Sequence, residues 1–327
     1  MKAVGLDQSS PLGMSDELAK STVLILSANM GYADMTLNFL CRLREISKTF
    51  KYIVFAQDPS FYKFLQWYNI PSVSGSVIHR VSTENDQTFR STEFNQISIA
   101  KMIATRIVLE LGYNVLFSDV DIAWKKNPMP FLAADVDLTI QSNSGTNIFS
   151  TIIGEPNTGF YFIKSNDRSM ALLDHTIKRA RDDPSLDDQS HFGSVLQEWH
   201  RSRKAIFMME GMSTPWIYHG YRPFTFRLLH PYLFQTGQVA FHPQKLDPPG
   251  DRKDQDIVLV HANFMVGHSS KVDFFKQHAL WHLKDQQFID YLVQWKSNNT
   301  TNKQQNDEHP QMNYQLALDT LSHVCVD

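Results

Sequence analysis

Two carboxylates, Asp119 and Asp121, stand two positions apart directly after a buried apolar run, a spacing suited to binding a metal ion. When the backbone between them bends, both side chains can turn toward one cation. Hard cations such as magnesium and manganese prefer oxygen ligands and often share them with substrate phosphates. Most isolated Asp-x-Asp pairs are turns or solvated surface residues. Here apolar residues frame the pair at 115–117 and 122–124, which favours a fixed metal site.

Short strands alternate with helices in the part of the chain that leads to this pair. Such alternation predicts an α/β fold with a parallel sheet, whose ligands bind outside the carboxyl ends of the strands. The loops that carry Asn29, Asp58 and Asp119 should all open on that edge. The predicted strands cover residues 22–28, 52–56 and 114–117, and the predicted helices cover 35–46, 60–67 and 94–111, the last capped by Gly112.

After Pro130 the pattern becomes mixed, which suits a second half of different architecture better than further regular repeats. Strands are predicted near 137–141 and 159–163, and a helix is predicted over 168–180. An aromatic-rich region follows. Its rings could form a stacking platform for a ligand, although core packing is the more common use of such residues. The aromatic residues concerned are Trp216, Tyr218, Tyr221, Phe224 and Phe226.

The composition describes a globular protein without a polyanion-binding surface. The 327 residues are 42% hydrophobic, enough for a sizeable core. Lysine and arginine number 31 against 34 acidic residues, a formal net charge of −3 with no long block of one sign. We therefore expect no nucleic-acid partner. The two cysteines, Cys41 and Cys325, exclude a disulfide framework and a cysteine-rich metal cluster, and both are expected to be unremarkable.

No run approaches the roughly 18 apolar residues that a membrane helix requires, so no membrane span is predicted. Residues 1–20 are polar and lack the basic flank and apolar run of a signal peptide. Taken literally, the sequence indicates a cytoplasmic protein. A Golgi-lumen enzyme without its N-terminal anchor would look the same. Asn298 and Asn299 both begin N-x-T sequons, which matter only in the secretory pathway.

The run Leu111–Pro128 (LGYNVLFSDVDIAWKKNP) resembles the signature of the nucleotide-diphospho-sugar transferases, which include plant arabinosyl- and xylosyltransferases and a cytoplasmic slime-mould galactosyltransferase. Three further segments match in order: 157–166, 187–189 and 261–271. The resemblance covers about residues 22–271. It implies a glycosyltransferase type A fold, a Rossmann-like mixed sheet flanked by helices with an acceptor-side half. It also implies that the anomeric configuration of the sugar is retained.

The resemblance also suggests how the chain is divided. Residues 1–20 are expected to be a flexible N-terminus and residues 21–296 the glycosyltransferase domain. Within it, about 21–130 would bind the nucleotide sugar and 131–296 would form the acceptor half. The polar stretch that begins at Ser297 is expected to be a linker, so 297–327 forms a linker and tail.

The segment HANFMVGHSSK supplies the partners that a metal-bound diphosphate needs. We expect His261 to add an imidazole to the two carboxylates, which favours manganese over calcium, with magnesium as the alternative cation. Gly267 would let the backbone approach the diphosphate and Lys271 would neutralise it, while Asn263 is assigned to nucleotide-sugar binding. The alternative is that His261 only holds a loop and that Lys271 is solvated.

Further donor-site residues are predicted with alternatives left open. Asn29 and Asp58 could accept hydrogen bonds from the base or ribose, or they could cap helices. Lys101 is suggested by the resemblance to face the donor diphosphate or sugar, but an exposed helical lysine is the alternative. Asn157 and Gly159 could contact sugar hydroxyls or simply form a turn.

The resemblance places Asp188 and Gln189 against the donor sugar, opposite the leaving group, whereas the bland interpretation is helix capping. Two routes to retention stay open. A protein group on the far face can form a covalent intermediate, or the acceptor can enter from the leaving-group side while the phosphate takes its proton. Because glutamine is a poor nucleophile, we favour the second route.

The sequence therefore predicts a metal-dependent, retaining glycosyltransferase. It would move a sugar of the galactose, xylose or arabinose class from a UDP-sugar to a hydroxyl of a glycan or glycoprotein. One alternative is a phosphohydrolase of the haloacid-dehalogenase type with Asp119 as nucleophile. That motif normally lies on the first strand of its domain, whereas two strand and helix units precede Asp119. A second alternative is an inactive glycan-binding relative.

Overall fold

The computed structural model describes residues 18, 20–47, 50–75, 92–143, 156–208, 222–241, 257–301, 321 and 323–326. Within these residues one sheet has eight strands in the order β3-β2-β1-β4-β7-β6-β9-β8, and a smaller sheet has the order β10-β11-β5. The strands are β1 (Thr22–Ala28), β2 (Tyr52–Ala56), β3 (Ser72–Ser74), β4 (Asn114–Ser118), β5 (Ile122–Trp124), β6 (Leu138–Ser142), β7 (Pro156–Ile163), β8 (Ala205–Phe207), β9 (Phe224–Leu228), β10 (Phe234–Gln235) and β11 (Leu259–His261).

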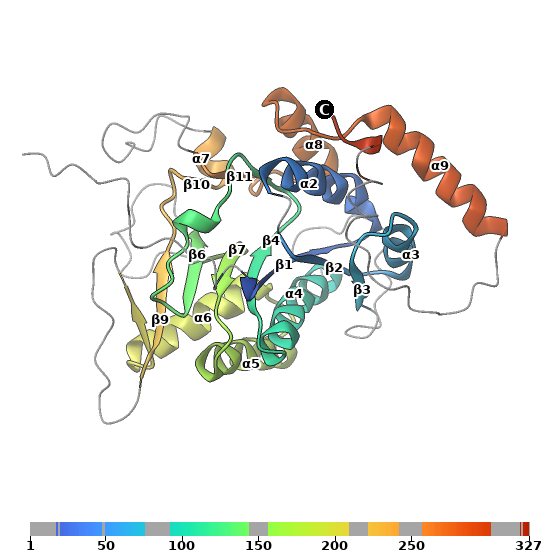
Figure 1. Cartoon of the computed structure of the whole chain (residues 1–327). Helices are drawn as coiled ribbons and strands as arrows, with labels where there is room; N and C mark the ends of the chain where they lie inside the picture. Colours follow the sequence, from blue (N-terminus) through green and yellow to red (C-terminus); the bar gives the residue numbers. More distant parts are fainter. Residues whose placement is uncertain are drawn as a thin grey trace, which may run out of the picture.

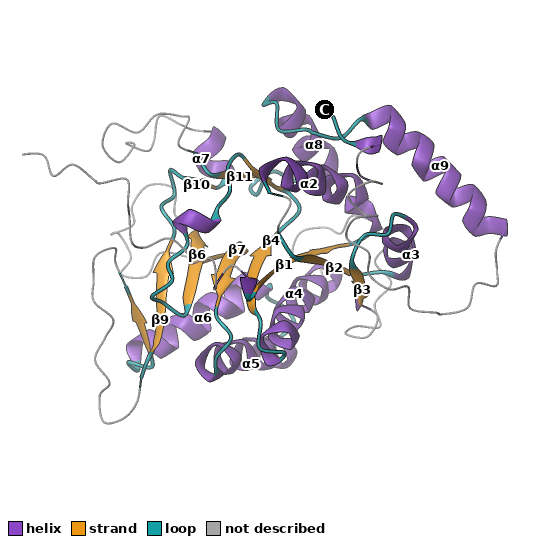
Figure 2. Cartoon of the chain, in the orientation of Figure 1, coloured by secondary structure: helices purple, strands orange, loops and turns teal. Residues whose placement is uncertain are grey.

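Helices lie on both faces of the large sheet (Figures 1 and 2). In the view of Figure 1, α4, α5 and α6 run below the strands, and α2 and α8 lie above them. The helices are α2 (Ala33–Ile46), α3 (Pro59–Trp67), α4 (Thr92–Glu110), α5 (Asp167–Asp182), α6 (Asp188–Arg201), α7 (Gly237–Phe241), α8 (His268–Gln277) and α9 (Asp285–Thr301), with 3-10 turns η1 (Met30–Tyr32) and η3 (Met129–Phe131).

Alternation along the central strands creates the three layers. Leu24 and Leu26 of β1 belong to the core under α2, whereas Ile25 belongs to the core over α4. Successive side chains of a strand point to opposite faces, so a strand that is apolar at every position must be covered on both sides. The structure thus has the predicted Rossmann-like mixed sheet flanked by helices.

The sheet is parallel on one side of β4 and mixed on the other. β3, β2, β1 and β4 run parallel, while β7 pairs antiparallel with both β4 and β6. β1 therefore lies between β2 and β4. After β1 the chain forms β2 and β3 on one side of it, and it then forms β4 on the other side. The carboxyl ends of strands at such a switch point are where α/β sheets bind ligands, and the segment with Asp119 begins there.

The predicted boundaries hold closely in the first half of the chain and less well at the C-terminal end. β1 and β2 have the predicted limits, and Gly112 follows α4 with φ of 86°, which suits a glycine. The linker predicted from Ser297 was placed too early, because α9 continues to Thr301. Phe288, Tyr291 and Leu292 pack α9 against the core. The helix then continues into the polar stretch.

The aromatic region divides into two parts. Phe224 and Phe226 of β9 are fully buried in the core over α6, so they follow the core-packing alternative. Trp216, Tyr218 and Tyr221 lie outside the described residues. Among the residues that the structure describes, no helix combines the length and the apolar character needed to cross a membrane.

The cysteines correct the sequence analysis. Cys41 of α2 and Cys325 form a disulfide bond across 284 positions of sequence, with their Cα atoms 5.3 Å apart. Two cysteines so far apart have no spacing signature, so the sequence analysis expected both to be unremarkable. The bond fastens the C-terminal segment, which also bridges to Leu283, to α2.

We predict that breaking this bond destabilises the protein without removing the fold. A cross-link that closes a long loop restricts the unfolded chain, so Cys41→Ser with Cys325→Ser should lower the free energy of unfolding by about 2–5 kcal/mol. Urea unfolding followed by circular dichroism measures the difference. Equal stability of the double variant and the oxidised protein would contradict the role assigned to the bond.

Candidate functional site

The segment that joins β4 to β5 carries both predicted carboxylates and is held at its two ends by backbone hydrogen bonds. The amide of Asp119 donates to the carbonyl of Gly159 at 2.7 Å, and the amide of Ala262 donates to the carbonyl of Asp121 at 2.9 Å. The segment is therefore attached to β7 on one side and to the end of β11 on the other. This fixes the directions in which the two carboxylates point.

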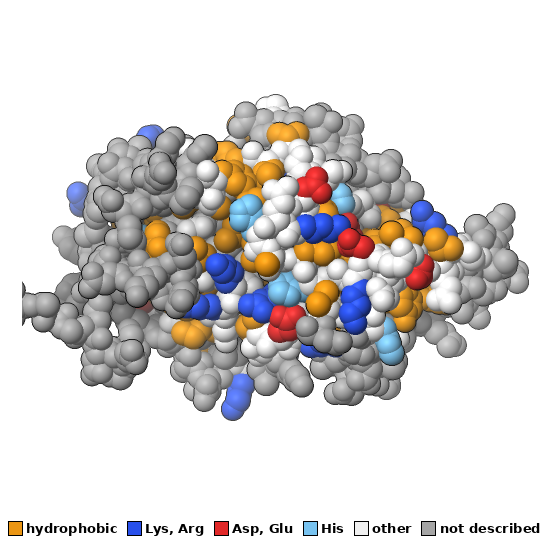
Figure 3. Space-filling model, turned by 90° about the horizontal axis from the view of Figure 1, so that it is seen from above, with side chains coloured by type: hydrophobic (Ala, Val, Ile, Leu, Met, Phe, Trp, Pro, Cys, Tyr) orange, Lys and Arg blue, Asp and Glu red, His pale blue; other side chains and the backbone are white. Residues whose placement is uncertain are grey.

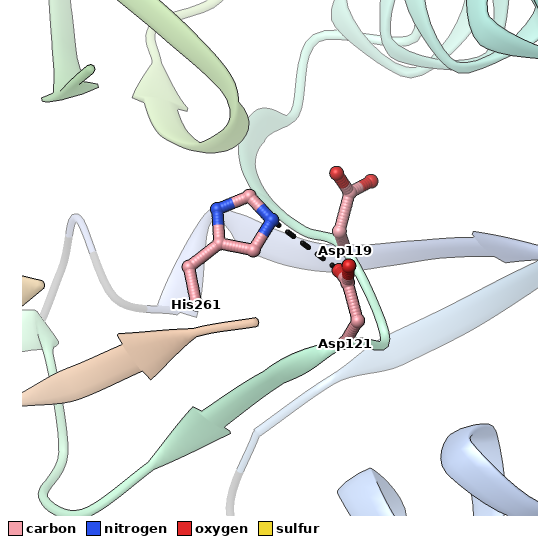
Figure 4. Close-up of side chains that lie close together, drawn as sticks. All are labelled: Asp119, Asp121 and His261. Atoms are coloured by element: carbon pink, nitrogen blue, oxygen red, sulfur yellow. Dashed lines mark ion pairs between the residues drawn. The ribbon is translucent and has the colours of Figure 1, made fainter. Parts of the chain in front are cut away.

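His261 reaches the carboxylates through the register of two short strands. β11 pairs antiparallel with β5, and His261 stands opposite Ile122, the residue after Asp121. The Nε2 atom of His261 lies 3.3 Å from Oδ1 of Asp121. Ligand atoms of Asp119, Asp121 and His261 all lie within 4.8 Å of one another, and Figure 4 shows the ring directed at Asp121. The structure thus brings together the three predicted metal ligands.

The pKa values of the two carboxylates shift in opposite directions. Burial raises the pKa of Asp119 to about 6, with the charge of Asp121 adding to the rise and Lys101 opposing it. Burial also acts to raise the pKa of Asp121, but the positive charge of Lys271 outweighs it, so that pKa lies well below its ordinary range. Asp119 therefore carries a charge that the protein only partly compensates. A cation beside it would relieve this cost, and two oxygens with one nitrogen form a donor set that suits manganese or magnesium.

Lys271 lies in the first turn of α8 and points back into the site. Its Nζ atom is 2.7 Å from Oδ2 of Asp121, and the ion pair raises the pKa of Lys271 despite its burial. Gly267 precedes the helix with φ of 88°, a conformation that favours glycine. Because the ammonium group of Lys271 lies here, this end of the site is suited to an anion.

Lys101 of α4 is not an exposed helical lysine, as the alternative supposed, but a buried link between two acids. Its Nζ atom lies 3.1 Å from Oδ2 of Asp188 and 3.6 Å from Oδ2 of Asp119. Burial alone would lower the pKa of Lys101, but these two carboxylates outweigh it and raise the pKa. The side chain therefore stays charged at the floor of the site.

Asp188 and Gln189 begin α6, next to β7. Asp187 supplies the N-cap by accepting from the amide of Ser190 at 2.7 Å, so capping does not require Asp188. Oδ2 of Asp188 instead accepts from Oγ1 of Thr158 at 2.7 Å, and Oε1 of Gln189 lies 3.4 Å from the amide of Thr158. Both side chains thus turn from the helix start toward the strand that borders the metal ligands.

Asp58 takes the capping role that the sequence left open. It is completely buried, and its two carboxylate oxygens accept from the amides of Phe61 and Met30, each at 2.7 Å. Asp58 thus caps α3 and fixes the segment that follows β1. Asn29, also buried, lies within that segment at the carboxyl end of β1.

Asn157 and Asn263 lie in an amide network around β7. Asn157 accepts from the amide of Gly159 at 2.8 Å and donates to Asn143 at 3.1 Å. Asn263 accepts from the amide of Gly237 at 2.7 Å and also donates to Asn143, at 3.4 Å. These bonds hold the start of β7 and the end of β11 together, and Asn157 lies within β7.

The sequence analysis missed Gln141, whose Oε1 atom lies 3.1 Å from Nδ1 of His261. It also missed Thr158, the partner of Asp188. A polar side chain within a strand that is otherwise apolar was the available signal for Gln141, because a buried amide must find partners. Seen from above, the described part of this face gathers acidic, basic and histidine side chains near its centre (Figure 3).

Comparison with known proteins identifies the family and several relatives of this chain. The family model described as nucleotide-diphospho-sugar transferase matches residues 48–275. The UDP-galactose:fucoside alpha-3-galactosyltransferase of Dictyostelium discoideum is 26% identical over 86% of this chain and 46% of its own length. The beta-arabinofuranosyltransferase RAY1 of Arabidopsis thaliana is 26% identical over 80% of this chain and 47% of its own. The chain thus spans about half the length of these curated relatives.

Among solved structures, the glycosyltransferase GlyE of Streptococcus pneumoniae aligns with a TM-score of 0.46. Its sequence identity is 11%, and the alignment covers 79% of this chain and 64% of GlyE.

We predict that Gly159→Ala disrupts the three-ligand cluster. A Cβ atom at this position would lie 2.3 Å from Cε1 of His261 and 2.8 Å from Oδ2 of Asp119, closer than such contacts allow. The variant should bind Mn²⁺ at least about tenfold more weakly than the wild type, since displaced ligands cost affinity. Titration calorimetry with Mn²⁺ measures this.

Gly193→Ala is the matched control, because its Cβ would meet only Pro156, at an ordinary 3.7 Å. Equal Mn²⁺ affinity in Gly159→Ala and Gly193→Ala would show that the close approach at Gly159 does not shape the site.

Proposed function

Since the chain belongs to the nucleotide-diphospho-sugar transferase family, we propose that it transfers a sugar from a UDP-sugar, using a divalent metal ion held by Asp119, Asp121 and His261. The observation that carries this proposal is the convergence of these three side chains at the end of β4, beside the ammonium group of Lys271. Manganese is the preferred ion because a nitrogen joins two carboxylates, with magnesium as the alternative.

The diphosphate would lie between the three ligands and the start of α8. Bound there, the metal ion would act as a Lewis acid that stabilises the negative charge developing on the leaving diphosphate. Lys271 would contribute its charge to the same oxygens, and the open space around Gly267 would let the backbone approach the diphosphate. When the diphosphate binds, Lys271 would exchange its contact with Asp121 for the phosphate.

The nucleoside and the sugar would extend along the same strand ends. We assign Asn29 and Asn263 to nucleotide-sugar contacts because they follow β1 and β11 at the edge of the site. Asp58 would act indirectly, because its buried carboxylate fixes the segment next to Asn29. Asn157 and Gly159 would form the wall behind the metal ligands, where the bare backbone of Gly159 leaves room for the His261 ring and the Asp119 carboxylate.

Lys101 and Asp188 would contact the donor sugar from the floor of the site, with Gln189 next to them. Oδ2 of Asp188 already accepts from Lys101 and Thr158, which makes this carboxylate an acceptor for sugar hydroxyls more readily than a nucleophile. Gln189 is a poor nucleophile. Both points support the route in which the acceptor hydroxyl attacks from the leaving-group side and gives its proton to the departing phosphate. The sugar then keeps its configuration.

The donor sugar belongs to the galactose, xylose or arabinose class, and the acceptor is a hydroxyl of a glycan or glycoprotein. The galactosyltransferase relative is named for a fucoside acceptor, so fucosides are the first acceptors to test with UDP-galactose. The family match disfavours the phosphohydrolase alternative, in which Asp119 would be a nucleophile. The inactive-relative alternative is disfavoured because the ligands, Lys101 and Lys271 are all present.

The disulfide bond provides evidence on the cellular compartment of the protein. Such bonds persist in secreted proteins and in the lumen of the secretory pathway, and they are rare in the cytosol. The bond between Cys41 and Cys325 therefore favours the Golgi-lumen alternative over the cytoplasmic one. Free thiols in the protein isolated from its own cells, detected by alkylation and mass spectrometry, would contradict this assignment.

We predict that UDP binds only together with Mn²⁺ and that Asp121→Ala removes this binding. Loss of a supporting residue around a metal typically costs about 10–100-fold in affinity, so loss of a ligand should cost at least about 100-fold. Titration calorimetry with UDP, with and without Mn²⁺, gives the affinities of the wild type and the variant.

Asp174→Asn is the control, since Asp174 is an exposed acid that pairs with Arg106 away from the site. It should bind UDP and Mn²⁺ as the wild type does. UDP binding that does not depend on Mn²⁺, or that persists in Asp121→Ala, would contradict the assignment of the metal site.

A further inference from the structure

His261 contacts a different partner through each of its ring nitrogens. Nε2 faces Oδ1 of Asp121 at 3.3 Å, and Nδ1 faces Oε1 of Gln141 at 3.1 Å. Gln141 is fully buried in β6, and His261 and Asp121 are at most 8% exposed. Because little water reaches the ring, these neighbours determine which nitrogen carries the proton.

The orientation of the Gln141 amide is fixed by its other end. Nε2 of Gln141 lies 3.1 Å from the carbonyl oxygen of Phe234 and 3.2 Å from that of Gln235. Carbonyl oxygens only accept hydrogen bonds, so they require the amide nitrogen on their side. A reversed amide would place an oxygen against two oxygens. Oε1 must therefore face His261.

The fixed amide in turn sets the tautomer of His261. Oε1 of Gln141 can only accept, so Nδ1 of the imidazole carries the hydrogen. In the neutral ring, Nε2 then holds a lone pair directed at the carboxylate of Asp121. A lone pair facing a carboxylate oxygen is unfavourable unless a cation lies between them. This is the arrangement of a metal ligand, whose second nitrogen is held by a hydrogen-bond acceptor.

We propose that Gln141 is the positioning residue of the site, fixing the ring and the Nδ1–H tautomer of His261 so that Nε2 is presented to the metal ion. The proposal rests on the proposed function, since it assumes that the three ligands bind a metal. Gln141 does not touch the metal or the donor. It links β10, through the carbonyls of Phe234 and Gln235, to the ligand on β11.

A neutral amide suits this position better than a carboxylate would. Glutamate at position 141 would place a negative charge against two carbonyl oxygens in a buried environment, which is costly. An amide donates to those carbonyls and accepts from the imidazole at the same time. It thus orients His261 without adding a further buried charge to Asp119, Asp121 and Asp188.

The test compares Gln141→Met with the wild type and with Thr139→Val. Methionine has a similar length but neither accepts from His261 nor donates to the carbonyls. Thr139 is a buried residue of the same strand whose Oγ1 has no hydrogen-bond partner among the described residues, so its variant controls for disturbance of β6. We expect Gln141→Met to bind Mn²⁺ about 10–100-fold more weakly, and Thr139→Val to bind as the wild type.

A second readout concerns the tautomer in the metal-free wild type. Long-range ¹H–¹⁵N spectra of protein labelled at histidine distinguish the two neutral tautomers, and the signal absent from His261→Ala identifies His261 among the 13 histidines. We expect Nδ1 to carry a hydrogen, because Oε1 of Gln141 faces it. This readout does not require any Gln141 variant to fold.

The outcomes separate the two proposals. If the wild type does not bind Mn²⁺, the metal site of the proposed function fails. If the wild type binds Mn²⁺ and His261→Ala does not, but Gln141→Met binds normally, the site stands and the role of Gln141 is overturned. An Nε2–H signal for His261 in the wild type would also overturn it. A lowered melting temperature in Gln141→Met with unchanged Mn²⁺ affinity would assign Gln141 a purely structural role.

Discussion

The site depends on one short pairing, that of β5 with β11. The two strands face each other over three residue pairs, and this register places His261 beside Asp121 although 140 positions separate them in sequence. The amide of Asp119 is held by β7 at the same time. Three segments that are separate in sequence are thus joined by backbone hydrogen bonds at one point. The backbone hydrogen bonds of the two sheets therefore determine the position of each ligand.

Charge is the second constraint on the structure. Asp119, Asp121 and Asp188 converge on a largely buried region, where Lys101 and Lys271 supply two compensating charges. One negative charge is left over, and burial raises the pKa of Asp119 accordingly. Such a region is costly to the folded protein in isolation. Binding of a cation and a phosphate would reduce this electrostatic cost. The cation would neutralise the carboxylates, and the lysines could then turn from the carboxylates to the phosphate.

Much of this arrangement could be predicted from the sequence because it depends on local patterns. Apolar periodicity located β1 and β2, and the apolar residues around Asp119 and Asp121 marked them as fixed. His261 was predicted from its resemblance to a family motif. By contrast, Gln141 and the bond between Cys41 and Cys325 depend on contacts between distant segments, which no local pattern encodes. Asp58 shows the remaining ambiguity, since capping and ligand binding use the same side chain.

The central claim is that Asp119, Asp121 and His261 hold one metal ion. Crystals grown with Mn²⁺ and UDP, measured at the manganese absorption edge, test it directly through the anomalous difference map. We predict a peak in contact with a carboxylate oxygen of Asp119, a carboxylate oxygen of Asp121 and Nε2 of His261, with the diphosphate of UDP on its open side. A map without a peak among these three side chains, or with a peak bound elsewhere while UDP occupies the site, would contradict it.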